Sequence, residues 1–147
     1  MIYVRGSMNI LLLEDDVAIR EIMITILESE GYSVISGQNG VEGLKHLTAM
    51  EQPPSIVLVD LSMPLMDGTE FLNHLNASPR WNAIPRIILT AAGNTKVPHH
   101  LADEVLKKPV HLEDLISTVE QYIEKRLEPS RSLTSELACM TSSHASI

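Results

Sequence analysis

Two apolar stretches of the sequence each end in acidic residues. Residues 56–59 lead directly into Asp60, and residues 10–13 lead into Glu14 and Asp15. Carboxylates that share a small site repel one another unless a cation neutralises them. Oxygen ligands without clustered His or Cys favour Mg²⁺, or Mn²⁺, over Zn²⁺. If the two stretches are neighbouring strands, their ends form a magnesium site where an Asp carboxylate can act as a nucleophile and form an acyl phosphate.

Two later stretches end in residues that suit the same chemistry. Residues 87–89 are apolar and lead into Thr90, and residues 104–107 lead into Lys108. A metal ion held by carboxylates with open coordination positions can bridge phosphoryl oxygens and offset their charge. Lys108 would add a point positive charge, and Thr90 would add a hydroxyl donor to the same oxygens. The side chains predicted to form the site are therefore Glu14, Asp15, Asp60, Thr90 and Lys108.

Such a site requires a parallel sheet, because the carboxyl ends of parallel strands meet at one edge, where ligands bind. Strand and helix patterns alternate along the chain. Asp16 is a candidate cap for the first helix, and Gly31 stands where that helix should end. The predicted strands are 9–14, 32–36, 56–60, 86–90 and 104–107, and the predicted helices are 17–30, 40–50, 69–76 and 112–126.

The first and last of these helices carry apolar residues at helical spacing, which predicts that one face of each packs on the sheet. The stripe of the first helix is Ile19, Ile22, Met23, Ile26 and Leu27, and that of the last is Leu112, Leu115, Ile116, Val119 and Ile123.

The segment 93–103 is the least regular part of the chain. Gly93, Asn94 and Pro98 disfavour a helix there, so we expect an irregular or mobile element. Five strands and about five helices in alternation predict an α/β fold, a doubly wound five-stranded parallel sheet with helices on both faces. The expected strand order is the flavodoxin-like 2-1-3-4-5.

Composition and charge narrow the range of partners. The chain has 147 residues, enough for one domain with a substantial core, and a formal net charge of −8, which argues against a nucleic-acid or anionic-membrane surface. There is one cysteine, Cys139, and neither a membrane-length apolar run nor a signal-peptide pattern is apparent. These features predict a cytoplasmic protein that binds proteins and cations.

The chain divides into three parts by composition. Residues 1–7, which end in Arg5-Gly6-Ser7, resemble the remnant of an expression tag. Residues 8–127 carry the alternating pattern of the domain, and residues 128–147 form a Ser/Thr-rich tail or linker without periodicity. That tail is too short for an effector domain, so we expect no transcriptional or enzymatic output from this sequence.

Four motifs, in order and on the expected elements, resemble the receiver domain of two-component response regulators, with the fold of the single-domain chemotaxis receiver. The resemblance covers nearly all of residues 9–126. The motifs are Glu14-Asp15-Asp16, Asp60-Leu-Ser-Met-Pro-Leu-Met-Asp-Gly, Thr90-Ala91 and Lys108-Pro109. Each motif is weak by itself, whereas all four together are specific.

The resemblance implies that Asp60 accepts a phosphoryl group from a phosphohistidine on a sensor histidine kinase or phosphotransfer protein. It implies that Asp15, Asp60 and the backbone carbonyl of Ser62 ligate Mg²⁺, with Glu14 acting mainly through a bound water. Asp16 corresponds to a variable position outside this ligand set. The protein would then be a signalling switch with a downstream protein partner, and it would catalyse at most its own phosphorylation and dephosphorylation.

The sequence departs from the family pattern near the expected output surface. Val105 stands three positions before Lys108, where the family usually has an aromatic switch residue, and the segment between Thr90 and Lys108 is a few residues short. Ser62 and Ala92 occupy positions that resemble those tuning autodephosphorylation in the family.

Two other functions compete with the phosphorylated switch. A constitutive binding module with the receiver fold would explain Val105 and the short output segment. A magnesium-dependent phosphohydrolase using an aspartyl phosphate ranks last, because the chain has no substrate-enclosing cap domain and no second obvious acid or base. Turnover of a generic phosphate ester would distinguish the hydrolase from the switch.

Overall fold

The computed structural model describes residues 8–125, so residues 1–7, the whole predicted tail (128–147) and the last residues of the predicted domain, 126–127, lie outside the described part. Five strands form one parallel sheet in the order β2-β1-β3-β4-β5, which confirms the predicted fold class and strand order. The strands are β1 (Asn9–Leu13), β2 (Ser33–Gly37), β3 (Ile56–Asp60), β4 (Arg86–Ala91) and β5 (Glu104–Lys108).

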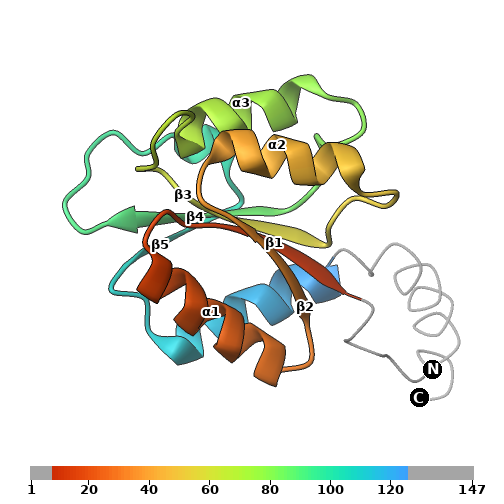
Figure 1. Cartoon of the computed structure of the whole chain (residues 1–147). Coiled ribbons are helices and arrows are strands. Elements are labelled where there is room, and N and C mark those ends of the chain that lie inside the picture. The colour runs from red at the N-terminus through yellow and green to blue at the C-terminus, as the bar shows by residue number, and fades with distance from the viewer. Residues whose placement is uncertain (1–7, 126–147) are drawn as a thin grey trace, which may run out of the picture.

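Helices cover both faces of the sheet, as Figure 1 shows. One face carries α2 (Gly40–Ala49) and α3 (Gly68–Ala77), and the other carries α1 (Val17–Ser29) and the C-terminal helix, residues 112–125, blue in the figure. No helix in the range 8–125 is long and apolar enough to cross a membrane.

The sheet separates two hydrophobic clusters. Every residue of β3 is buried, because this central strand is covered on both faces and flanked by β1 and β4. On one side it packs with Met23 and Leu27 of α1 and Leu115, Val119 and Ile123 of the C-terminal helix. On the other it packs with Leu47, Phe71, Leu72 and Leu75.

Three residues of the predicted apolar stripes are exposed to solvent. The helices form as predicted, but Ile19 is 37% exposed, Ile22 is 59% exposed and Leu112 is 48% exposed. Met23 and Leu27, one turn apart, make the buried contact of α1 instead. The apolar stripe in the sequence is therefore wider than the face that the sheet covers.

An irregular segment joins β4 to β5, as predicted from Gly93, Asn94 and Pro98. Within the described residues it contains only the single 3₁₀ turn η2 (His99–Leu101), so the structure has four α-helices and not five. Gly93 has φ +86°, a conformation that disfavours continuation of a helix. Leu101 belongs to the hydrophobic cluster that contains Leu47 of α2 and Phe71, Leu72 and Leu75 of α3, called here the α2/α3 cluster, and Val97 packs against it. This segment therefore helps to cover the sheet face.

Gly68 sets the distance between α3 and the end of β3. A Cβ atom added at this first residue of α3 would lie 2.4 Å from the Asp60 carbonyl oxygen and 2.8 Å from the Leu61 Cα. Backbone atoms cannot move aside without displacing the strand end. We therefore expect Gly68→Ala to lower the free energy of unfolding by about 3 kcal/mol, measured by urea titration.

Gly40 provides a matched control for this prediction, because it is also the first residue of a helix, α2. An added Cβ there meets the side chain of Met66, which is flexible and can move. Gly40→Ala should cost about 1 kcal/mol or less. Equal losses in the two variants would contradict the backbone explanation.

Candidate functional site

The candidate site lies at the carboxyl edge of the sheet, where β1 and β3 end side by side. Their pairing extends to Leu13 with Val59, so the next residues, Glu14 and Asp60, emerge together. Glu14 is fully buried and Asp60 is 6% exposed, while the adjacent Asp15 is exposed. One carboxylate oxygen from each of Glu14, Asp15 and Asp60 can be chosen so that all three lie within 4.8 Å of one another.

Glu14 is held in place by three neighbouring residues, one each from β2, α1 and the turn before α1. Its N–H donates to the carbonyl of Gly37 at the end of β2, at 3.0 Å. The Arg20 guanidinium of α1 donates to the Glu14 carbonyl at 2.8 Å, and the Asp16 N–H donates to its carboxylate at 3.3 Å. Arg20 was not among the predicted site residues, because a helix position alone does not reveal a contact with a strand end.

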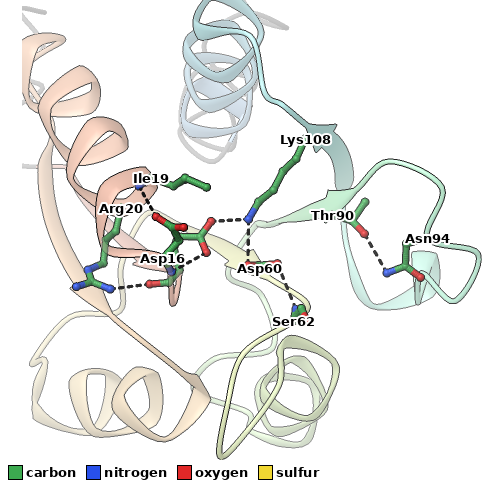
Figure 2. A network of polar contacts seen from close by, with 9 residues as sticks. Asp16, Ile19, Arg20, Asp60, Ser62, Thr90, Asn94 and Lys108 are labelled. Atoms are coloured by element: carbon green, nitrogen blue, oxygen red, sulfur yellow. Dashed lines mark hydrogen bonds and ion pairs between the residues drawn. The ribbon is translucent and has the colours of Figure 1, made fainter.

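Asp16 caps α1, as predicted. Its carboxylate accepts from the Ile19 N–H at 3.0 Å, and its side chain is exposed. Figure 2 shows this bond beside the acidic group. Asp16 is not one of the three clustered carboxylates.

Lys108 reaches both buried carboxylates from the end of β5. Its Nζ donates to Glu14 Oε1 at 2.5 Å and to Asp60 Oδ2 at 3.0 Å, as Figure 2 shows for Asp60. Burial lowers the pKa of Lys108, but its bonds to the two carboxylates outweigh that effect, so the net pKa is raised. The lysine is therefore a fixed positive charge at neutral pH.

Glu14 is a carboxylate of the site whose pKa is clearly raised by its surroundings. Burial, followed by the neighbouring Asp60 carboxylate, raises its pKa to about 7, although Lys108 acts to lower it. The positive charge of Lys108 alone therefore does not offset the cost of keeping both buried carboxylates ionised. The donor set contains only oxygen atoms, and both its charge and its chemistry fit a hard divalent cation such as Mg²⁺.

The other two predicted residues lie at the margin of this group. Ser62 follows the strand end, is exposed, and donates its N–H to Asp60 Oδ1 at 3.2 Å. Thr90 is the next-to-last residue of β4 and is 2% exposed, but among the described residues its hydroxyl is bonded to Asn94 and not to Asp60 or Lys108. Asn94 was not a predicted site residue, and its position in an irregular segment gave no signal for this contact.

A comparison of the sequence with models of known protein families identifies the family to which this arrangement of carboxylates, lysine and hydroxyl belongs. The profile of the response regulator receiver domain matches residues 10–120. The chain belongs to the response regulator receiver domain family. Receiver domains of this family are phosphoacceptor modules of two-component systems, are phosphorylated by histidine kinases and bind Mg²⁺ at their acidic site.

Some curated relatives of this receiver domain are much longer than the matched region, and others are little longer than it. The chain is 30% identical to a CpxR homolog of Haemophilus influenzae over 86% of this chain and 55% of the relative. It is 32% identical to a probable chemotaxis protein CheY of Rhizobium etli over 78% of this chain and 91% of the relative. The chain spans about half the length of the first curated relatives that it matches.

Solved receiver structures share the fold. A CheY-like receiver domain protein of Methanospirillum hungatei matches with a TM-score of 0.74 and 26% identity, over 83% of this chain and 98% of the other. A receiver domain protein of Clostridium thermocellum matches with a TM-score of 0.73 and 26% identity, over 81% and 96%. The relatives that the chain matches are response regulators, which are signalling proteins.

Asp15 and Asp16 offer a direct test of which acidic residues hold the metal. We expect Asp15→Asn to weaken Mg²⁺ binding at least tenfold, because it removes one charged carboxylate from the clustered group. The measurement is the rise in melting temperature with Mg²⁺ concentration, since a ligand that binds only the folded state stabilises it.

Asp16→Asn is the matched control, because asparagine caps helices as well as aspartate does. This variant should keep both the stability of the metal-free protein and its response to Mg²⁺. A larger loss of Mg²⁺ response in Asp16→Asn than in Asp15→Asn would contradict the assignment of the ligands.

Proposed function

We propose that this receiver domain is a phosphorylation-controlled switch in which Asp60 accepts a phosphoryl group from a phosphohistidine of a sensor histidine kinase or phosphotransfer protein. The observation that carries the proposal is the placement of Asp60. Its nearly buried carboxylate ends the central strand, belongs to the three-carboxylate group and lies 3.0 Å from the Lys108 ammonium.

Each side chain has a role in the proposed transfer. An Asp60 carboxylate oxygen attacks phosphorus, an O–P bond forms, and the N–P bond of the phosphohistidine breaks with its electron pair going to the imidazole nitrogen. The Ser62 N–H and the Lys108 ammonium hold the Asp60 oxygens in orientation before the attack. Lys108 and the Thr90 hydroxyl then serve as donors to the phosphoryl oxygens.

Glu14, Asp15, Asp60 and the Ser62 carbonyl are the residues proposed to hold Mg²⁺, or Mn²⁺, with Glu14 acting mainly through water. Bound there, the ion would neutralise charge on the carboxylates and on the phosphoryl oxygens. The raised pKa of Glu14 supports this role, because burial and the neighbouring Asp60 carboxylate both disfavour the charged form of Glu14, which a bound cation would stabilise.

The downstream partner is proposed to be a protein, and the location the cytoplasm. The net charge of −8 supports protein binding over nucleic-acid binding for this chain. Some relatives are named as transcriptional regulators, but the chain matches only about half of their length.

The proposal is tested by incubating the full chain with Mg²⁺ and acetyl phosphate and following its intact mass. We expect an adduct of one phosphoryl group that is lost when EDTA replaces Mg²⁺, and peptide mapping after reduction of the acyl phosphate should locate it at Asp60. If a folded, Mg²⁺-binding protein forms no adduct with acetyl phosphate or with a histidine-kinase donor, the constitutive binding module becomes the better reading. Val105 and the irregular β4–β5 segment are the features that favour that second function.

A further inference from the structure

The Thr90 hydroxyl is bonded to a residue of the irregular segment that follows β4. Asn94 Nδ2 donates to Thr90 Oγ1 at 3.1 Å, and Figure 2 shows the Thr90 side chain turned toward this amide. Thr90 is 2% exposed, so water has little access to its hydroxyl. Asn94 therefore makes the one side-chain hydrogen bond that the described part of the chain provides to Thr90 Oγ1.

The orientation of the Asn94 amide is determined by its second bond. The Lys96 N–H donates to Asn94 Oδ1 at 2.9 Å, and only the oxygen of an amide can accept it. The NH₂ group must then face Thr90, which makes Thr90 Oγ1 the acceptor. Because a hydroxyl has one proton and two lone pairs, the Thr90 proton stays available for another acceptor.

Asn94 is also anchored through its backbone. Its N–H donates to the Ala91 carbonyl at 3.2 Å and closes a four-residue turn, in which Gly93 has φ +86°. This positive φ is what a type II turn requires at its third residue, and it favours glycine. Val97, three residues on, packs against the α2/α3 cluster. The Asn94 amide thus joins the buried hydroxyl to a segment that is itself attached to the core.

We infer that Asn94 is a positioning residue that holds Thr90 Oγ1 as an acceptor, so that the Thr90 proton is directed to the phosphoryl group on Asp60, and that couples this hydroxyl to residues 94–97. The inference rests on the proposed function of Asp60. Val105 cannot take this part, because its side chain has no donor or acceptor and packs in the α2/α3 cluster.

Two substitutions of Asn94 distinguish a role in orienting the Thr90 hydroxyl from a role in closing the loop alone. Asn94→Asp keeps an oxygen for the Lys96 N–H, but the carboxylate has no donor for Thr90 and would take the Thr90 proton. Asn94→Ala removes both bonds and leaves the Thr90 hydroxyl proton free to bond to the phosphoryl group. Positioning predicts that Asn94→Asp is the more damaging change, whereas a loop-closing role predicts that Asn94→Ala is.

The measurement is the rate constant for adduct formation from acetyl phosphate and Mg²⁺, followed by intact mass on the full chain. We expect Asn94→Asp to lower it about tenfold, the factor for one hydrogen bond to a charged group, and Asn94→Ala to lower it about threefold at most. Thr95→Ala, in the same exposed segment, is the control for trimming a side chain that has no bond to Thr90.

Asn94→Asp also adds a negative charge, and the effect of this charge on the rate is measured by making the same substitution in a Thr90→Val protein. Without the hydroxyl, the same substitution should lower the rate less than twofold, because only screened repulsion remains. The inference is overturned if Asn94→Asp reacts at the wild-type rate, if Asn94→Ala is slower than Asn94→Asp, or if the tenfold loss persists with Thr90→Val. An absence of any adduct on the folded wild-type protein, with either phosphodonor, would instead overturn the proposed function, and the inference with it.

Discussion

Asp60→Asn is expected to form no phosphate adduct with acetyl phosphate and Mg²⁺ under conditions in which the wild-type chain is modified. An amide has no carboxylate oxygen to attack phosphorus, and the other two clustered carboxylates are placed differently. Glu14 is fully buried against Lys108, and Asp15 is exposed outside the strand end. Intact mass gives the result directly, and the same protein can be assayed for folding by circular dichroism.

The same variant should be at least as stable as the wild type without metal. Replacing Asp60 removes a carboxylate that raises the pKa of Glu14, and Lys108 then pairs with Glu14 alone. Relief of this repulsion predicts a gain of about 1 kcal/mol in the free energy of unfolding. A loss of adduct with a gain in stability identifies a chemical role and excludes misfolding as the cause.

Asp67→Asn is the matched control in the same turn. Asp67 caps α3 by accepting from the Glu70 N–H at 2.9 Å, and asparagine preserves this cap. The control should be phosphorylated like the wild type. An adduct that survives in Asp60→Asn at the wild-type level would show that another residue is the acceptor and would refute the proposed function.

Lys108→Met should slow phosphorylation of Asp60 but tighten Mg²⁺ binding. Removing the ammonium takes away a donor 3.0 Å from Asp60 Oδ2 and should slow phosphorylation about a hundredfold, as the loss of a preorganised charge stabiliser does elsewhere. Mg²⁺ binding should tighten several-fold, because a cation beside two of the clustered carboxylates has gone. The pKa of Glu14 should rise above about 7, since Lys108 acts to lower it.

Lys107→Met controls for the loss of one positive charge from the same strand. Lys107 is exposed on β5 and forms no ion pair with another residue in the range 8–125, so both rate and Mg²⁺ affinity should stay within about twofold of the wild type. Rates come from intact mass, and affinities come from the Mg²⁺ dependence of melting. Weaker Mg²⁺ binding in Lys108→Met would contradict the idea that lysine and metal compete for the same negative charge.

Much of the architecture was readable in the sequence because it follows from local patterns. The uninterrupted apolar run before Asp60 marked a strand buried on both faces, and β3 is buried throughout. Asp16 was predicted to cap the first helix, and it does so through a bond between residues three apart. Regular alternation of strands and helices left few topologies, so the strand order also followed.

Helix exposure was less predictable because it depends on how each helix sits on the sheet. Ile22 and Leu112 fit a helical stripe, yet both are largely exposed. Periodicity tells which residues share a face of a helix. It does not tell how much of that face the neighbouring elements cover.

The sequence by itself determined the fold class, the strand positions to within about one residue and the residue types gathered near the strand ends. Tertiary structure alone decided the electrostatics and the local partners. Lys108 bonds to Glu14 across 94 residues of sequence, burial raises the pKa of Glu14 to about 7, and the Thr90 hydroxyl is held by Asn94. The physical reason is that hydrogen bonds and desolvation depend on distances of a few ångströms between separate elements, and the sequence does not contain those distances until the chain is packed.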